Sequence, residues 1–278
     1  MSQFTYLLRF KAEDGKVYYG NLLREKPIAD LIGSKVPVMV GVPIKGLQHT
    51  GDFKIILCPL ASVPIYQCIG VNYERHARET NFSVPSQPIV FTKPADSVAG
   101  PFDTVYVHPD ARSQLDYEGE LCFIFGRDCK DVSEDAALDN ILGYSVGNDI
   151  SARNYIPQEI SGFQMSYGKS FDAFGPFGPY IVHPNAVGDP HKLQLVTKVN
   201  GEVRQNENTS DMIWDIKKII VHLTRGRTVR AGTVCMTGTP SGVGWFMTPN
   251  GYVKDGDVIE VTIEKLGTIS NKIRFPSE

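Results

Sequence analysis

Residues 115–126, LDYEGELCFIFG, decide the fold class because they predict a strand that is buried on both faces. Residues 121–125 are apolar at every position, so neither face of this strand is typical of a surface exposed to water. Glu118 and Glu120 lie two positions apart and therefore point to the same face. Gly119 has no side chain, which lets another group approach the strand between them.

Two carboxylates on one face of a buried strand need a positive partner. The alternative is a solvated strand end, and the apolar neighbours leave the two interpretations evenly balanced. Asp149 ends a second apolar run, YSVGND at 144–149. Glu118, Glu120 and Asp149, with no Cys or His pattern beside them, favour a hard cation such as Mg²⁺ with water completing its shell.

Strand-forming runs also dominate outside this stretch. We expect a hairpin over 4–21 within a small N-terminal β domain (1–60), a main domain over 61–278, and a hairpin over 193–205. Asn72, Ser133 and Ser210 are the predicted N-caps of three helices, over 72–80, 134–142 and 211–226. The alternation typical of Rossmann and TIM folds is missing, so the sequence predicts an α+β fold that is mainly β.

The composition excludes several classes of protein. A net charge of −3 argues against a nucleic-acid partner, and no apolar run is long enough for a membrane span. The first residues do not resemble a signal or transit peptide. The five cysteines are scattered, without a CxxC pair, so we expect a cytoplasmic protein without disulfides.

Three further motifs each have an ordinary alternative. His76 and Glu79 share a helix face and could form a general base, although most such pairs are surface contacts. Lys169 lies in SYGKSFDAFGPFGP, where the glycine spacing does not fit a P-loop, so nucleotide binding is rejected. The TGTPSGVG stretch at 237–244 could offer backbone N–H groups to a carboxylate, or be a plain tight turn.

Taken in order, these motifs resemble the fumarylacetoacetate hydrolase family, in particular its small members, over about residues 52–273. The matching stretches are GVNYERHARE (70–79), FTKP (91–94), LDYEGEL (115–121), GYSVGNDISAR (143–153), GKSFDAFGPFGP (168–179), VNGEVRQ (199–205) and TGTPSGVG (237–244). The resemblance implies a mixed β-roll or sandwich with the small N-terminal β annex, and a homodimer. It also implies one Mg²⁺ or Mn²⁺ ion held by Glu118, Glu120 and Asp149.

The resemblance also implies roles for other residues. His76 and Glu79 match a catalytic dyad on a lid helix, and Lys169 matches a lysine that contacts the substrate carbonyl or enolate. Gly238 and Thr239 match a turn that contacts the substrate carboxylate. Arg153 matches the arginine of the SAR motif and is a candidate substrate-binding residue.

The implied activity is hydrolysis of a C–C bond in a 2-oxo acid or β-dicarbonyl compound, of the acylpyruvate or fumarylacetoacetate type, through a metal-bound enolate. The alternatives are oxaloacetate-type decarboxylation and enol–keto isomerisation on a less polar substrate. A non-catalytic binding protein would be expected to lack one of the carboxylates, the dyad or the lysine, and all six residues are present.

Ile156 generates a prediction about the substrate. Relatives commonly carry Gln three residues after the SAR arginine, whereas this chain has Ile156. A missing hydrogen bond to a charged group costs about 1.5–3 kcal/mol, so oxaloacetate turnover should be about ten- to a hundredfold less efficient than in Gln-bearing relatives. The preferred substrate should instead carry an apolar group far from its 2-oxo acid end. Ile156→Gln should raise the ratio of oxaloacetate to acylpyruvate turnover, and an unchanged ratio would contradict this role.

Overall fold

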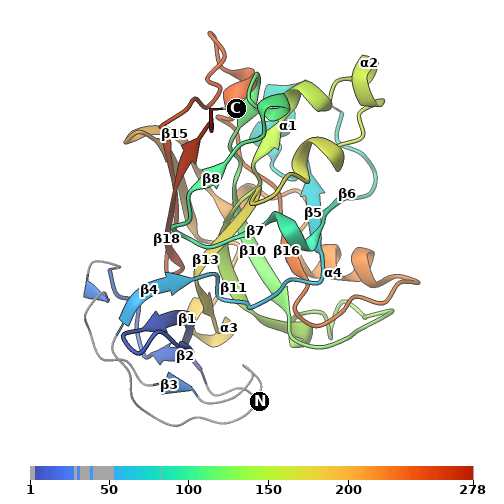
Figure 1. Cartoon of the computed structure of the whole chain (residues 1–278). Helices are drawn as coiled ribbons and strands as arrows, with labels where there is room; N and C mark the ends of the chain where they lie inside the picture. The colour runs from blue at the N-terminus through green and yellow to red at the C-terminus, as the bar shows by residue number, and fades with distance from the viewer. Residues whose placement is uncertain (1–3, 28–29, 32–37, 40–52, 82, 278) are drawn as a thin grey trace.

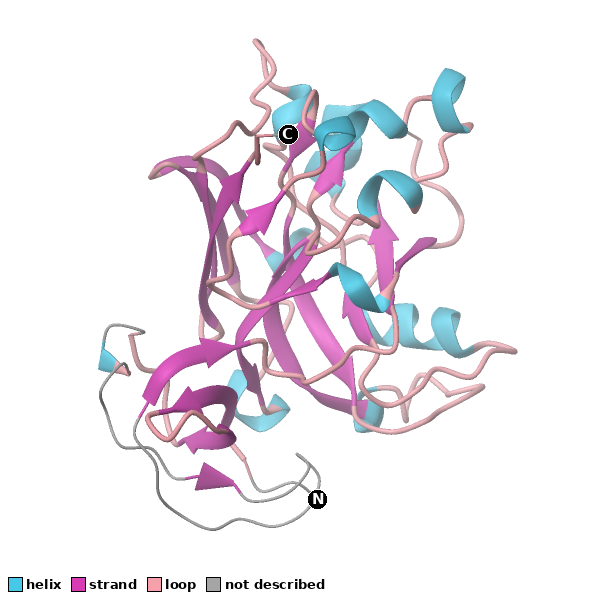
Figure 2. Ribbon diagram, in the orientation of Figure 1, coloured by secondary structure: helices cyan, strands magenta, loops and turns pink. Residues whose placement is uncertain are grey.

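Strands are the predominant regular structure of the described residues, and they are organised in two main sheets (Figures 1 and 2). The computed structural model describes residues 4–27, 30–31, 38–39, 53–81 and 83–277. This confirms the predicted mainly β, α+β fold class. In the described part of the chain, no helix is both long and apolar enough to cross a membrane.

The larger sheet has eleven strands and carries the central part of the molecule. Its order is β3-β2-β1-β13-β11-β10-β16-β5-β6, with β4 paired to β1 and β7 paired to β13. The strands are β1 (Tyr6–Ala12), β2 (Val17–Leu22), β3 (Val38–Met39), β4 (Phe53–Leu57), β5 (Tyr66–Gly70), β6 (Ile89–Lys93), β7 (Val98–Ala99), β10 (Gly119–Phe125), β11 (Ile141–Asn148), β13 (Gly175–Val182) and β16 (Val234–Met236).

A five-stranded sheet of order β15-β14-β17-β18-β8 packs against β10, β11 and β13. Its strands are β8 (Val105–Tyr106), β14 (Gln194–Val199), β15 (Glu202–Asn208), β17 (Val258–Ile263) and β18 (Gly267–Arg274). A two-stranded sheet joins β9 (Leu115–Asp116) to β12 (Ser151–Ala152). The main core lies between the two large sheets, where Leu121, Phe123 and Val261 are fully buried.

Both predicted hairpins are confirmed. Antiparallel β1 and β2 pair Tyr6 with Leu22, and β14 and β15 pair on either side of the Asn200-Gly201 turn. The N-terminal strands also join the large sheet, because β1 pairs with β13 as well as with β2 and β4. The predicted domain boundary at residue 60 stays a prediction.

The LDYEGELCFIFG stretch is buried from Leu115 to Phe125, but it forms two strands rather than one. β9 ends at Asp116 and β10 begins at Gly119, so Glu118 lies just before β10. Gly119 makes the close packing possible, since a Cβ atom there would lie 2.2 Å from Thr197 Oγ1 on β14. The group that approaches the strand at Gly119 is therefore Thr197 of the facing five-stranded sheet.

The three predicted N-caps are wrong. Helix α1 (Glu74–Thr80) begins after Tyr73, and the Asn72 side chain instead donates to the carbonyls of Trp214 and Thr237. Residues 134–140 form a turn and a short 3₁₀ segment, Leu138–Asn140, and β11 begins at Ile141, so no helix follows Ser133 here.

The long helix is α4 (Ile216–Thr224), which begins five residues later than the sequence predicts. Its N-cap is Asp215, whose Oδ1 accepts from the Lys218 N–H at 2.9 Å, rather than Ser210. The sequence predicts an apolar stripe of Ile213, Ile216, Ile220 and Leu223 on this helix. The last three are buried on α4 as expected, whereas Ile213 lies before the helix begins. Two shorter helices, α2 (Gln158–Ser161) and α3 (Pro184–Val187), complete the α-helices of the described residues.

The position of the α4 N-cap can be tested by stability. Asp215→Ala should lower the free energy of unfolding by about 0.5–2 kcal/mol, because one N–H group at the helix start loses its acceptor. Ser210→Ala is the matched control and should change it by less than about 0.5 kcal/mol. Urea unfolding of both variants provides the measurement. Equal losses would place the start of the helix nearer Ser210.

Candidate functional site

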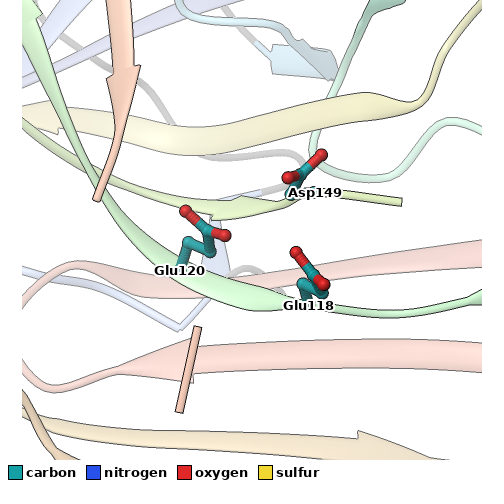
Figure 3. A group of neighbouring side chains, drawn as sticks. All are labelled: Glu118, Glu120 and Asp149. Atoms are coloured by element: carbon teal, nitrogen blue, oxygen red, sulfur yellow. The ribbon is translucent and has the colours of Figure 1, made fainter. Parts of the chain in front are cut away.

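Glu118, Glu120 and Asp149 form one buried cluster, in which one carboxylate oxygen of each lies within 4.8 Å of the others. Figure 3 shows the three side chains turned toward one another from two neighbouring chain segments. Antiparallel pairing explains this, because Gly119 of β10 lies opposite Asn148 of β11, which brings Asp149 beside Glu118. The exposed fractions are 6%, 1% and 0%, so the carboxylates are withdrawn from water.

Two lysines and an arginine balance most of this charge. Lys169 Nζ lies 2.7 Å from both Glu118 Oε2 and Asp149 Oδ2. Lys93 Nζ lies 2.6 Å from the other oxygen of Asp149, Oδ1. Arg153 bridges Glu118 Oε1, at 2.6 Å from Nη2, and Asp116 Oδ2, at 2.9 Å from Nε.

The pKa shifts in the cluster follow from burial and charge. Burial raises the pKa of Glu118, but Lys169 and Arg153 outweigh it and lower this pKa to about 2. Burial, together with the like charges of Asp149 and Glu118, raises the pKa of Glu120 well above its usual value. One more positive charge among Glu118, Glu120 and Asp149 would lower the pKa of Glu120 again and keep this carboxylate ionised.

These residues fit a divalent cation. The cluster offers only carboxylate oxygens, the donors that Mg²⁺ and Mn²⁺ prefer. Three positive side chains face the four carboxylates of Asp116, Glu118, Glu120 and Asp149, which leaves a negative charge for a cation to offset.

His76 and Glu79 form a hydrogen-bonded pair on α1, with Nδ1 2.8 Å from Glu79 Oε2. A carboxylate oxygen accepts, so Nδ1 carries the proton and Nε2 is left to accept one. The other oxygen of Glu79 accepts from the Gly242 N–H at 2.9 Å. His76 is 5% exposed, so the pair is not the surface contact that its spacing alone would favour.

The 237–244 turn contacts the carboxylate cluster directly. Gly238 has φ +100 and donates its N–H to Glu120 Oε2 at 2.7 Å. A Cβ atom on Gly238 would lie 2.7 Å from Asn72 Cβ, so both the backbone angle and the space require glycine. The Thr239 hydroxyl donates to the Gly119 carbonyl and accepts from Gln205 Nε2. The Gly238 N–H and the Thr239 hydroxyl hydrogen are therefore already used within the protein.

A cavity of about 340 Å³ connects the dyad with the cluster. Its polar lining includes His76, Glu118, Arg153, Lys169 and Thr239. Much of the remaining wall is apolar, formed by side chains that include Ile89, Phe91, Ile156, Met165, Trp245 and Phe246. Ile156 thus reaches the same cavity as the cluster, as the sequence predicts for a residue near the substrate.

Three residues of the site were not predicted. Lys93 is fully buried beside Asp149, and Asp116 binds Arg153 and the N–H groups of Gly244 and Trp245. Gln205 joins Gly119 to the 237–244 turn. A signal existed for two of them: Asp116 continues the two-residue spacing of Glu118 and Glu120, and Lys93 shares its strand face with the buried Phe91.

Known proteins with similar sequences and folds show the family of this chain. Residues 66–274 match the family model described as fumarylacetoacetate (FAA) hydrolase C-terminal. The chain is 43% identical to oxaloacetate tautomerase YisK of Bacillus subtilis (strain 168), over 74% of this chain and 68% of that protein. It is 39% identical to the mitochondrial oxaloacetate tautomerase fahd2 of Xenopus laevis, over 78% and 68%.

The fold agrees as well. The solved structure of a fumarylacetoacetate hydrolase from psychrophilic Exiguobacterium antarcticum superposes with a TM-score of 0.81 at 34% identity, covering 98% of this chain and 99% of the other. The fold and the site define an enzyme that carries a buried carboxylate cluster at the ends of two central strands of a large β-sheet. The chain belongs to the fumarylacetoacetate hydrolase family.

Cation binding by the cluster can be measured directly. Glu120→Gln should weaken Mn²⁺ binding in isothermal titration calorimetry by more than about tenfold, because it removes a charged oxygen from the cluster. The exposed Glu13→Gln is the control and should bind like the parent. EDTA should lower the melting temperature of the parent, since a ligand that binds the native state stabilises it. Equal Mn²⁺ affinity in Glu120→Gln and the parent would exclude this cation site.

Proposed function

We propose that the protein interconverts the keto and enol forms of a 2-oxo acid. One observation carries the proposal: a single cavity is lined by the base His76, by the carboxylate Glu118 and by the ammonium group of Lys169. Relatives that are named oxaloacetate tautomerases support this choice over C–C bond hydrolysis.

The residues of the cavity would divide the reaction between them. His76 Nε2 would take a proton from the carbon next to the 2-oxo group, and Glu79 would stabilise the imidazolium that results. Lys169 would place positive charge near the 2-oxo oxygen as that oxygen becomes negative. The proton returns to the oxygen in the enol direction and to the carbon in the keto direction, so no water is consumed.

Glu118, Glu120 and Asp149 would hold a divalent cation, Mg²⁺ or Mn²⁺. When bound, the cation would act as a Lewis acid toward the oxygens of the 2-oxo acid. The Thr239 hydroxyl donates to Gly119 and the Gly238 N–H to Glu120. We therefore propose that the 237–244 turn supports the carboxylate cluster. The substrate carboxylate would lie against this turn.

The cavity wall supports a substrate with an apolar end. Ile156, Phe163, Met165 and Trp245 line the same cavity as the polar groups. Each methylene buried there would contribute about 0.8 kcal/mol. We propose a 2-oxo acid with an alkyl or aryl group distal to the carboxylate, which agrees with the prediction from Ile156.

Hydrolysis of a C–C bond in an acylpyruvate is the second candidate function. The His76–Glu79 pair could equally take a proton from water, and the fold is shared with a fumarylacetoacetate hydrolase. The homodimer and the cytoplasmic location stay predictions.

Removing the base tests the proposal. His76→Ala should slow tautomerisation about 10²–10⁴-fold, the usual contribution of a general base, and should leave Mn²⁺ affinity unchanged. Arg78→Ala, on the exposed side of the same helix, is the control and should retain activity. The ultraviolet absorbance of the enol follows the reaction, and chromatography of acylpyruvate products detects cleavage. Cleavage without enol–keto exchange would favour the hydrolase, and full activity of His76→Ala would exclude the base.

A further inference from the structure

Lys93 is a fully buried lysine at the end of β6, and the proposed reaction does not use it. Its Nζ donates to the carbonyl oxygens of Ile150, Lys169 and Phe174 at 3.1, 2.6 and 2.7 Å. It also lies 2.6 Å from Asp149 Oδ1. The ammonium group thus has four oxygen neighbours in a place without water-exposed surface.

These contacts use both the donors and the charge of Lys93. An ammonium group has three N–H donors, and three carbonyl oxygens accept them. The ammonium group also forms an ion pair with Asp149 Oδ1, so its charge faces a carboxylate while its N–H groups face the carbonyls. A neutral residue of the same length would satisfy neither the carbonyls nor the carboxylate.

The Lys93 ammonium group contacts two parts of the candidate site, the Asp149 carboxylate and the Lys169 backbone. Because Lys93 occupies Oδ1 of Asp149, the opposite oxygen, Oδ2, faces Lys169 and Glu118. Because Lys93 also binds the Lys169 carbonyl, it holds the backbone from which the Lys169 ammonium extends. Lys169 ends a short 3₁₀ segment, Tyr167–Lys169, in a loop-rich part of the chain, so this backbone gains little support from regular structure.

We infer that Lys93 is a positioning residue, which strengthens cation binding by fixing the orientation of Asp149 even though its own charge repels a cation. The inference rests on the proposed metal-dependent function. Outer-shell groups that orient a ligand are typically worth 10–100-fold in metal affinity.

Lys169 offers a matched comparison on the same carboxylate. Its ammonium lies 2.7 Å from Asp149 Oδ2 and from Glu118 Oε2, so it contacts two of the three carboxylates of the cluster. Lys169 would therefore compete with a cation for these carboxylates, whereas Lys93 contacts only the other oxygen of Asp149. The two lysines carry equal charge at nearly equal distance from Asp149, yet they should affect cation affinity in opposite directions.

The experiment is calorimetric titration of Mn²⁺ into the metal-free full-length protein and three variants. Lys93→Met should weaken binding about 10–100-fold. Lys169→Met should strengthen binding by roughly tenfold or more, because it removes a nearby positive charge. The exposed Lys192→Met removes one charge elsewhere and should bind like the parent. Melting temperatures in EDTA report separately on folding.

The outcomes separate the inference from the proposed function. Absence of Mn²⁺ binding by the parent would overturn the metal-dependent function itself. Binding by the parent, with Lys93→Met equal to it or tighter, would overturn the positioning role alone, since a purely electrostatic effect strengthens binding. If Lys93→Met does not fold, Lys93→Ala is titrated with and without butylamine. Mn²⁺ affinity restored by the amine supports the inference, and affinity equal to that of the parent without the amine overturns it.

Discussion

Everything in this molecule depends on placing negative charge in its interior. Glu118, Glu120 and Asp149 are almost completely buried in the core of the larger sheet, where isolated carboxylates would not remain ionised. Lys169, Lys93 and Arg153 approach the cluster from different chain segments, and each contacts an oxygen of Glu118 or Asp149. Breaking a buried ion pair by removing one partner costs far more than losing a surface pair. The central strands and the segments around residues 93, 153 and 169 are therefore linked energetically as well as by sheet pairing.

The second sheet takes part in the site, although it contributes none of the carboxylates. Thr197 of β14 packs so closely on β10 that only glycine fits at position 119. Gln205 of β15 accepts from the Gly119 N–H and donates to Thr239 and to the Pro240 carbonyl. One amide thus fixes the distance between the carboxylate strand and the 237–244 turn. The packing of the two sheets therefore also sets the geometry of the candidate site.

The sequence predicts the parts of this structure that follow from local spacing. The pairing of Glu118 and Glu120 on one face, the two hairpins and the apolar stripe of α4 all depend on residues close in the chain. The three predicted helix starts are wrong because Asn72, Ser133 and Ser210 are of residue types that often cap helices, while tertiary contacts decide whether each one does. Asn72 is used by Trp214 and Thr237, more than 140 residues away. Lys93 was missed for the same reason, since its partners are at 149, 150, 169 and 174.

Glu79 connects the imidazole of His76 to the 237–244 turn. One of its oxygens orients His76 and the other accepts from Gly242, in the turn that holds Glu120 through Gly238. One carboxylate therefore links the His76 imidazole to the turn that contacts Glu120. A ligand that displaced this turn would also disturb the hydrogen bond that orients the imidazole, so the two ends of the cavity would respond to one another.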